Sequence, residues 1–128
     1  MRLLLDTHAF LWFVTANPRL SSEAESAIRE SRNELLLSVA SVWETAIKSK
    51  LGRLPIPQPL DAFIPEHLRT NRIGLLSIKL RHTFEVARLP LHHRDPFDRL
   101  LVAQAVTEGI ALVSADTTFD DYQVHRIW

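Results

Sequence analysis

The stretch LLLDTHAFLW, residues 3–12, runs from three leucines directly into an aspartate and then into an apolar, aromatic segment. This pattern predicts a short buried strand over residues 2–5, followed by a helix over residues 7–15. Burial in an apolar core explains the leucines, but it gives no reason for a carboxylate where the strand ends. Asp6 is therefore the first residue for which the sequence suggests a role beyond folding.

The composition favours one globular domain that spans residues 1–128. Hydrophobic residues make up 46% of the chain and charged residues 23%, which is ordinary for such a domain. The 15 basic and 15 acidic side chains give a formal net charge of zero, so contacts with a nucleic acid must rest on local charge. The absence of cysteine excludes disulfides, cysteine-based zinc sites and thiol nucleophiles.

No segment of the sequence is typical of membrane targeting. Asp6 and His8 interrupt what would be the apolar part of a signal peptide, and no apolar run is long enough to span a bilayer. The lack of cysteine fits a reducing compartment. We therefore expect a cytoplasmic protein without a membrane partner.

The other elements follow from periodicity and from helix start and stop signals. Ser22 to Glu25 has the S-x-x-E form of a capping box and predicts a helix that runs to about Arg32. Another helix is predicted over residues 39–50, with an apolar face formed by Val39, Val42, Trp43, Ala46 and Ile47. Further helices are expected at residues 60–69, 79–88 and 96–108, and further strands at 35–37, 73–78, 110–114 and 124–128. Strands that alternate with helices predict a single α/β domain with a mostly parallel central sheet.

Acidic residues gather where the predicted strands end. Asp6 follows the first strand, Glu44 lies in the helix after the second, Asp116 follows the fourth, and Asp95 and Asp98 begin the helix before the fourth. Ligands of open parallel sheets bind at this carboxyl edge. Two carboxylates about 4 Å apart repel by roughly 4 kcal/mol at an effective dielectric of about 20, so converging acids favour a bound cation. Mg²⁺ or Mn²⁺ suits an all-oxygen site and supports phosphoryl chemistry.

Each acid also has a purely structural interpretation. Asp6 can cap the following helix, Ser41 and Glu44 have the spacing of a capping box, and Asp116 can open a turn with Thr117. No single acid decides between the two interpretations. Their shared placement at one sheet edge is what favours function.

Four motifs of the chain resemble those of the PIN-domain ribonucleases, and within them the VapC-type toxins of bacterial toxin–antitoxin pairs. LLLDTHAFLW is similar to the first motif and SVASVWETAIK (38–48) to the second. HHRDPFDRLLVAQA (92–105) is similar to the third and ALVSAD (111–116) to the fourth. The resemblance covers nearly the whole chain. It implies a sheet ordered 3-2-1-4-5 and sandwiched by helices, Mg²⁺- or Mn²⁺-dependent cleavage of single-stranded RNA, a homodimer and an inhibitory antitoxin.

The resemblance also implies roles for individual residues. Asp6 and Asp98 become direct metal ligands, while Glu44 and Asp116 ligate through water or orient the attacking water. The hydrogen-bonding groups that support these acids are expected from Thr7 and Ser114.

Asp95 and Asp98 compete for the third acid position, and helix capping separates them. Proline favours the first position of a helix, so Pro96 makes Asp95 the N-cap and leaves Asp98 to project from the first turn. Family alignment also places the acid directly before RLLVAQA, which starts at Arg99. We therefore assign Asp98 to the metal and Asp95 to the cap.

Several other polar and aromatic residues are weaker candidates. Lys48, Lys50, Arg53 and Arg99 are candidates for contact with RNA phosphates, against the alternative of a solvated surface. For the pair His92–His93, a polar loop is favoured over a transition-metal site. Two aromatic residues are candidates for a dimer or antitoxin interface, Trp12 and Phe13.

Two alternative functions remain open from the sequence. A phosphatase or phospho-acceptor domain would use Asp6 as its nucleophile, but His8 stands where such a site has its second aspartate. A non-catalytic interaction domain of PIN-like architecture would be expected to have a broken acid set, whereas all four acids are present.

Overall fold

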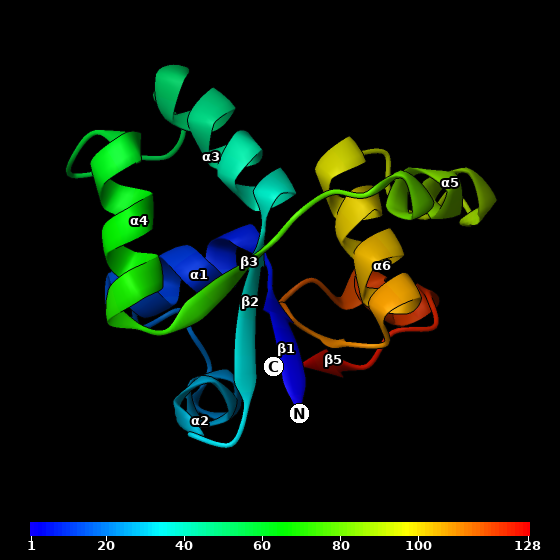
Figure 1. Cartoon of the computed structure of the whole chain (residues 1–128), viewed down its shortest axis with the longest axis horizontal. Helices are drawn as coiled ribbons and strands as arrows, with labels where there is room; N and C mark the ends of the chain where they lie inside the picture. The colour runs from blue at the N-terminus through cyan, green and yellow to red at the C-terminus, as the bar shows by residue number, and fades with distance from the viewer.

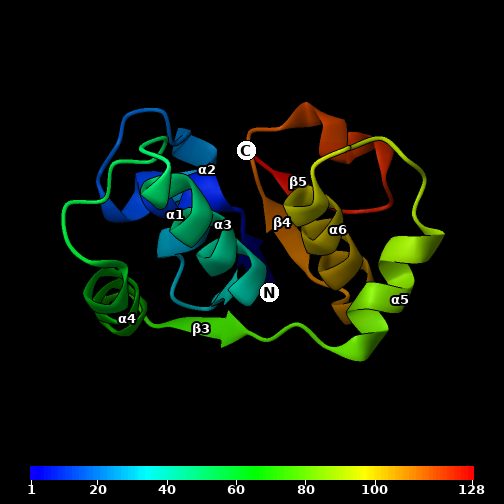
Figure 2. The same cartoon turned by 90° about the horizontal axis from the view of Figure 1, so that it is seen from above.

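The computed structural model describes residues 1–128 and contains one parallel sheet between two layers of helices (Figures 1 and 2). The elements in chain order are β1 (Arg2–Leu5), α1 (Thr7–Val14), α2 (Ser22–Arg29), β2 (Glu34–Ser38), α3 (Val39–Lys50), α4 (Leu60–Thr70), β3 (Ile73–Leu76), α5 (Leu80–Arg88), α6 (Pro96–Glu108), β4 (Ala111–Val113), a 3₁₀ helix (Thr117–Asp121) and β5 (Arg126–Ile127). The strand order is β3-β2-β1-β4-β5 and every pairing is parallel. The predicted α/β class and sheet order are confirmed.

The central strand β1 shows why both faces of the sheet are covered. Successive side chains of a strand point to opposite faces, and Leu3, Leu4 and Leu5 are all fully buried. Leu3 and Leu5 belong to a core with α1, α2 and α4, whereas Leu4 belongs to a second core with α6. A continuous leucine run therefore marks a strand that is buried on both sides.

Helix α3 rises from the carboxyl edge of the sheet and contacts both α1 and α6 (Figure 1). The boundaries predicted for α3 and α6 are confirmed residue for residue. Gly109 ends α6 with a φ of +65°, a left-handed conformation that suits glycine after a helix. The predicted capping box of α2 is wrong, since Ser21 and not Ser22 is the N-cap and accepts a hydrogen bond from the amide of Ala24.

The predicted apolar face of α3 forms, but it is not the face that is buried. Trp43 is 56% exposed and Ile47 is 39% exposed. The buried residues are small or polar: Ala40, Ser41, Glu44 and Thr45. Helix α3 thus turns a polar side inward, because this side faces the carboxyl ends of the strands rather than the apolar core.

None of the helices combines the length and the apolar character that a membrane crossing requires.

Candidate active site

A cavity of about 170 Å³ lies at the carboxyl edge of the sheet, between the starts of α1 and α6 and the inner side of α3. Its lining is strongly acidic, with carboxylates from every motif identified in the sequence. The lining residues are Asp6, Thr7, His8, Glu44, Lys48, Asp95, Asp98, Asp116 and Phe119. The structure therefore brings the four candidate acids together from four separate segments of the chain.

Asp6 is held in place by two backbone contacts. Its amide donates to the carbonyl of Val113 in β4 at 3.0 Å, and its Oδ1 accepts from the amide of Ala9 at 2.7 Å. Burial raises the pKa of Asp6 above its ordinary value, despite lowering contributions from the Ser114 hydroxyl and the Ala9 amide. Asp6 is thus a helix cap and a member of the acid cluster at once, so its two interpretations are compatible.

Glu44 is 5% exposed and has two partners inside the cavity. The Thr7 hydroxyl donates to Oε1 at 2.5 Å, and the Lys48 ammonium group pairs with Oε2 one helical turn further on. The capping-box interpretation of Glu44 is wrong, because Ser38 is the N-cap of α3 and the hydroxyl of Ser41 has no hydrogen-bond partner. Glu44 is therefore a buried carboxylate that is paired with Lys48 of the same helix.

Asp95 and Asp98 lie side by side at the start of α6 and differ in the hydrogen bonds that their carboxylates accept. Oδ1 of Asp95 accepts from the amides of Phe97 at 2.8 Å and Asp98 at 3.2 Å, with Pro96 in the first turn. Asp98 accepts no such bond. Burial, followed by the charge of Asp95, raises the pKa of Asp98 to about 7. A carboxyl group with so high a pKa is short of positive charge, which is the condition that a cation would relieve.

Asp116 follows β4 and is oriented through both of its oxygens. Oδ1 accepts from the amide of Thr118 at 2.9 Å, and Oδ2 lies 3.0 Å from Nε2 of His93. The Ser114 hydroxyl accepts from the amide of Asp116 at 3.0 Å. Partial burial would raise the pKa of Asp116, but the hydrogen bonds from His93 and Thr118 outweigh it and hold this pKa below its usual range.

His93 is the site residue that sequence reasoning missed, since a polar loop was the favoured interpretation. It is only 8% exposed and lies between Asp116 and the ring of Tyr122. Nitrogen of His93 and oxygens of Asp98 and Asp116 all lie within 4.8 Å of one another. Residues 93 and 98 are separated by a loop and a helix start, so no periodic pattern in the sequence relates them.

The donor set fits a divalent cation. Carboxylate oxygens dominate it, as Mg²⁺ and Mn²⁺ prefer, and burial, followed by neighbouring carboxylates, raises the pKa values of Asp6 and Asp98, an effect that a bound cation would offset. Asp95, which the sequence analysis assigned to the cap, also lines the cavity and adds to this negative potential. The ammonium group of Lys48 is the one lysine charge among the lining residues.

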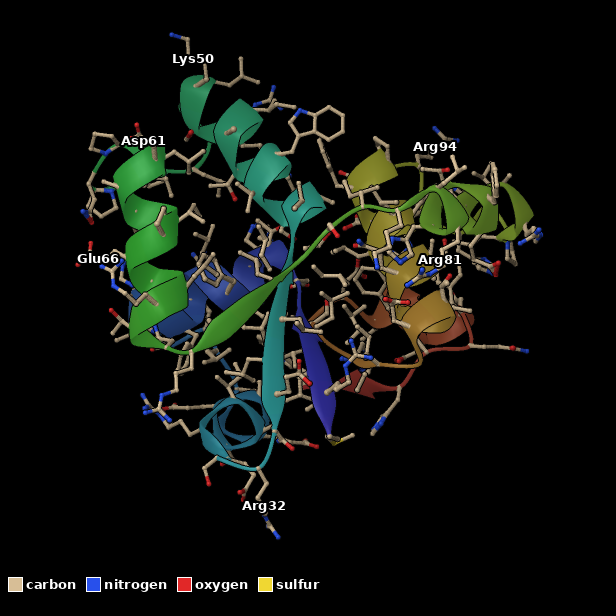
Figure 3. The ribbon with its side chains drawn as sticks, in the orientation of Figure 1. Arg32, Lys50, Asp61, Glu66, Arg81 and Arg94 are labelled. Carbon is tan, nitrogen blue, oxygen red and sulfur yellow. The ribbon has the colours of Figure 1, made fainter.

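The basic residues proposed to contact RNA have different surroundings. Lys48 lies in the acid cavity, and Arg53 lines a neighbouring cavity that shares His8 with it. Lys50 projects from the far end of α3, away from the site (Figure 3). Arg99 is occupied, because its guanidinium donates to the carbonyl oxygen of Val86 in the last turn of α5 at 2.9 Å and to that of Pro90 after this helix at 3.0 Å.

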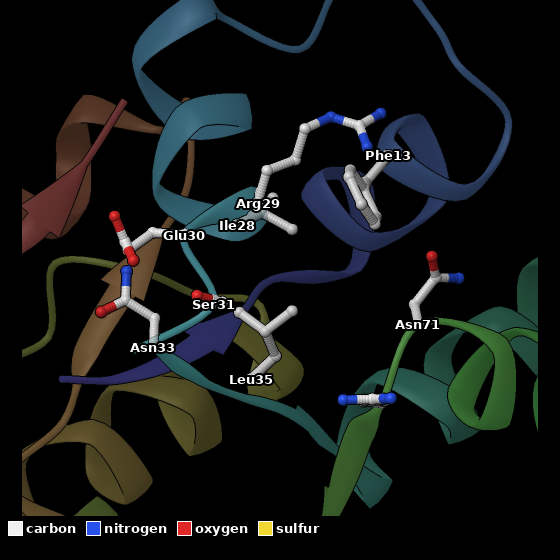
Figure 4. A pocket seen from close by; sticks show the side chains of 9 residues that line it. Phe13, Ile28, Arg29, Glu30, Ser31, Asn33, Leu35 and Asn71 are labelled. Atoms are coloured by element: carbon white, nitrogen blue, oxygen red, sulfur yellow. The ribbon is translucent and has the colours of Figure 1, made fainter.

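A larger cavity, of about 290 Å³, lies at the opposite edge of the sheet (Figure 4). It is lined by residues that precede strands or end helices, among them Asn33, Asn71 and Arg72. The guanidinium of Arg29 lies over the ring of Phe13 at 5.2 Å and pairs with Glu25. This edge brings no acids together, and it is the edge at which parallel α/β sheets do not place ligands.

A parallel sheet ordered 3-2-1-4-5 with a cluster of acids at its carboxyl edge defines an α/β domain with a candidate metal site. The model of the PIN domain family matches residues 3–124, so the chain belongs to this family.

Two relatives from Mycobacterium tuberculosis (strain ATCC 25618 / H37Rv) are similar to the chain. It is 30% identical to Ribonuclease VapC22 over 121 residues, which cover 89% of the chain and 86% of that protein. It is 38% identical to Ribonuclease VapC16 over 71 residues, which cover 52% of the chain and 50% of that protein. The match to VapC16 thus spans about half the length of that relative.

Solved structures share the fold at low sequence identity. The structure of VapBC2 from Rickettsia felis, bound to a promoter DNA fragment, matches with a TM-score of 0.71 at 14% identity and covers 98% of the chain and 97% of its own. FitAcB from Neisseria gonorrhoeae matches with a TM-score of 0.62 at 16% identity and covers 97% and 95%. These likenesses support the fold assignment alone.

Proposed function

We propose that this chain is the endoribonuclease toxin of a toxin–antitoxin pair and that it uses Mg²⁺ or Mn²⁺ to cleave single-stranded RNA in the cytoplasm. The observation that carries the proposal is the convergence of Asp6, Glu44, Asp98 and Asp116 on one cavity. Membership of the PIN family and two relatives named as VapC ribonucleases support the same activity. No feature of the structure favours a phosphatase that uses Asp6 as nucleophile.

In this proposal the four acids have two different roles toward the metal. Asp6 and Asp98 hold the metal directly, while Glu44 and Asp116 act through water molecules. Thr7 fixes Glu44 by donating its hydroxyl to Oε1. A divalent metal held by these acids would neutralise charge on the phosphate and lower the pKa of a water molecule, which is the chemistry that hydrolysis to 5′-phosphate and 3′-hydroxyl ends requires.

Lys48 has a second task in this arrangement. Burial opposes its charge, but the hydrogen bond and the charge of Glu44 outweigh burial and hold the pKa of Lys48 above its ordinary value. The ammonium group therefore stays charged at neutral pH. It partly compensates the acids without metal and offers a cation to a phosphate that approaches the cavity.

We propose two protein partners as well, an antitoxin that covers the acid cavity and a second copy of this chain. The outer side of α3 exposes Trp43, Ile47 and Leu51, spaced four residues apart, and the ring of Trp43 meets that of Phe97 edge-on at 5.0 Å. Aromatic residues on such a surface are typical anchors of an interface. Trp43→Asp should shift a dimer toward monomer in light scattering, whereas Leu80→Asp on α5 should not, and equal behaviour of the two variants would contradict this interface.

The activity is tested by incubating the pure chain with labelled single-stranded RNA in Mg²⁺, in Mn²⁺ or in EDTA. Asp98→Asn is the test variant, and Asp61→Asn, an exposed acid at the start of α4, is the matched control (Figure 3). We expect metal-dependent cleavage by the wild type and by Asp61→Asn, and loss of cleavage by Asp98→Asn. Cleavage in EDTA, or full cleavage by Asp98→Asn, would reject the proposal.

A further inference from the structure

We propose that His93, held by the Tyr122 hydroxyl, is a positioning residue that aims Asp116 into the metal site. This inference deepens the proposed function and rests on it. It adds a residue pair, His93–Tyr122, that neither the sequence motifs nor the family match assigns a role. The inference is supported by a series of hydrogen bonds that runs from Tyr122 through the imidazole of His93 to Asp116.

The Tyr122 hydroxyl lies against two nitrogens of His93. Its oxygen accepts from the backbone amide of His93 at 3.0 Å and lies 3.2 Å from Nδ1. In the proposed arrangement, the hydroxyl donates its own proton to Nδ1. The neutral imidazole then carries its proton on Nε2, which donates to Oδ2 of Asp116 at 3.0 Å.

Stacking makes this geometry rigid. The ring of His93 lies nearly parallel to that of Tyr122, at 5.5 Å and 13°, and 4.6 Å from the ring of Phe119. The imidazole is therefore locked between two aromatic rings. A locked donor restricts rotation of the Asp116 carboxylate, whose other oxygen is held by the amide of Thr118 at 2.9 Å.

The proposed metal ligands line the acid cavity, and a residue that only orients a ligand need not do so. Asp6, Glu44, Asp98 and Asp116 line the acid cavity, whereas His93 does not. Nε2 of the imidazole is engaged by the Asp116 carboxylate, and the ligand atoms of His93, Asp98 and Asp116 lie within 4.8 Å of one another, so direct ligation by His93 is the alternative that the test must exclude. Such partners orient metal ligands, and their loss commonly weakens metal affinity or activity by about 10- to 100-fold.

The test measures Mn²⁺ affinity by electron paramagnetic resonance, which requires neither RNA nor cleavage. His93→Phe keeps a ring between Tyr122 and Phe119 but removes the donor, and we expect the Kd for Mn²⁺ to rise roughly tenfold. Tyr122→Phe keeps the stack but frees Nδ1, and a smaller rise is expected. His93→Gln places an amide donor near the position of Nε2 and should restore part of the affinity. The matched control is His92→Phe, an exposed neighbour that contacts Tyr122 only edge-on.

A second arm separates positioning from a general effect on the fold. In an Asp116→Asn background, His93→Phe should change the Kd little further, because the carboxylate that it orients is gone. A purely structural role predicts a lower melting temperature with unchanged Kd in every variant, and this result would overturn the inference. Nitrogen-14 modulation from a directly bound imidazole, seen in the wild type and lost in His93→Phe, would overturn positioning in favour of ligation.

The outcomes also separate this inference from the proposed function. If the wild type binds no Mn²⁺ through its acids, both fail. If the wild type binds Mn²⁺ and cleaves RNA while His93→Phe keeps both properties, only the role of His93 is rejected.

Discussion

The two edges of the sheet contain cavities of opposite character. The cavity at the amino edge is larger, about 290 Å³, and two of its three charged lining residues are paired, Arg29 with Glu25 and Glu30 with Arg32. The cavity at the carboxyl edge is smaller, about 170 Å³, and collects five carboxylates around one lysine. Cavity volume therefore does not identify the site. The direction of the chain identifies the site, because all the parallel strands end at the acidic edge and the helices that follow them begin there.

Substitutions at the two edges of the sheet should differ most in their effect on RNA cleavage. Asp6→Asn at the acidic edge should lower RNA cleavage by roughly a hundredfold or more, the scale on which loss of one preorganised electrostatic group acts. The fold should persist, because asparagine also caps a helix and can accept from the Ala9 amide. Gel assays of cleavage and circular dichroism check the two halves. Cleavage at the wild-type rate would remove Asp6 from the site.

Metal should stabilise the folded chain through the acidic edge only. Saturation with Mn²⁺ at about 100 times its Kd adds roughly 2.7 kcal/mol to the free energy of unfolding, provided that the unfolded chain does not bind it. We expect this rise in the wild type and in Arg29→Ala, and a much smaller rise in Asp98→Asn. Thermal melts with and without Mn²⁺ measure it, and an equal rise in Asp98→Asn would contradict the assignment.

The raised pKa of Asp98 predicts how stability without metal depends on pH. The unfolded carboxyl group ionises near pH 4, whereas the folded one stays protonated up to about pH 7, so ionisation lowers the free energy of unfolding as pH rises through this window. His82, whose pKa burial lowers, acts oppositely below pH 6.5. The difference between wild type and Asp98→Asn isolates the aspartate. Urea unfolding in EDTA should show the wild type losing stability relative to Asp98→Asn from about pH 4 to about pH 7, the limits of that window.

The cap of α6 gives a smaller and separable effect. Asp95→Ala removes an acceptor for the amides of Phe97 and Asp98, and should cost about 1 kcal/mol of stability. Asp95→Asn keeps the cap and should retain both the fold and most of the cleavage. If Asp95→Asn abolishes cleavage while Asp98→Asn spares it, the roles of the two aspartates are reversed.

The smallest effect is expected at the amino edge. Arg29→Ala removes an exposed ion pair with Glu25 and a contact over Phe13, which together are worth about 1 kcal/mol or less. Cleavage should stay at the wild-type level because no acid of the site is near. A loss of cleavage without a loss of stability would show that the larger cavity has a function after all.

Sequence periodicity predicted most of this architecture because its signals are local. The leucines of β1 and β2, Pro96 and Gly109 fix strands and helix ends without reference to the rest of the chain. Strand ends then placed the acids at one edge. The cap of α2 was missed by one residue, since Ser21 and Ser22 are chemically equivalent candidates.

What the sequence did not reveal depends on contacts between distant segments. The burial of the polar side of α3 follows from its position over the strand ends, and an amphipathic pattern alone predicts the opposite. His93 meets Tyr122 and Asp116 only after the loop before α6 folds over the 3₁₀ helix. Arg99 was a candidate for RNA contact in the sequence but is occupied by carbonyl oxygens in and after the last turn of α5.

The double use of Asp6, as a cap and as an acid of the site, has a genetic consequence under the proposed function. The codons of aspartate become asparagine codons by a single base change, and asparagine preserves the cap. A cell under selection to escape the toxin can therefore silence the chain without unfolding it. Because its fold would be kept, the inactive protein would still present the surface that the antitoxin covers in this proposal.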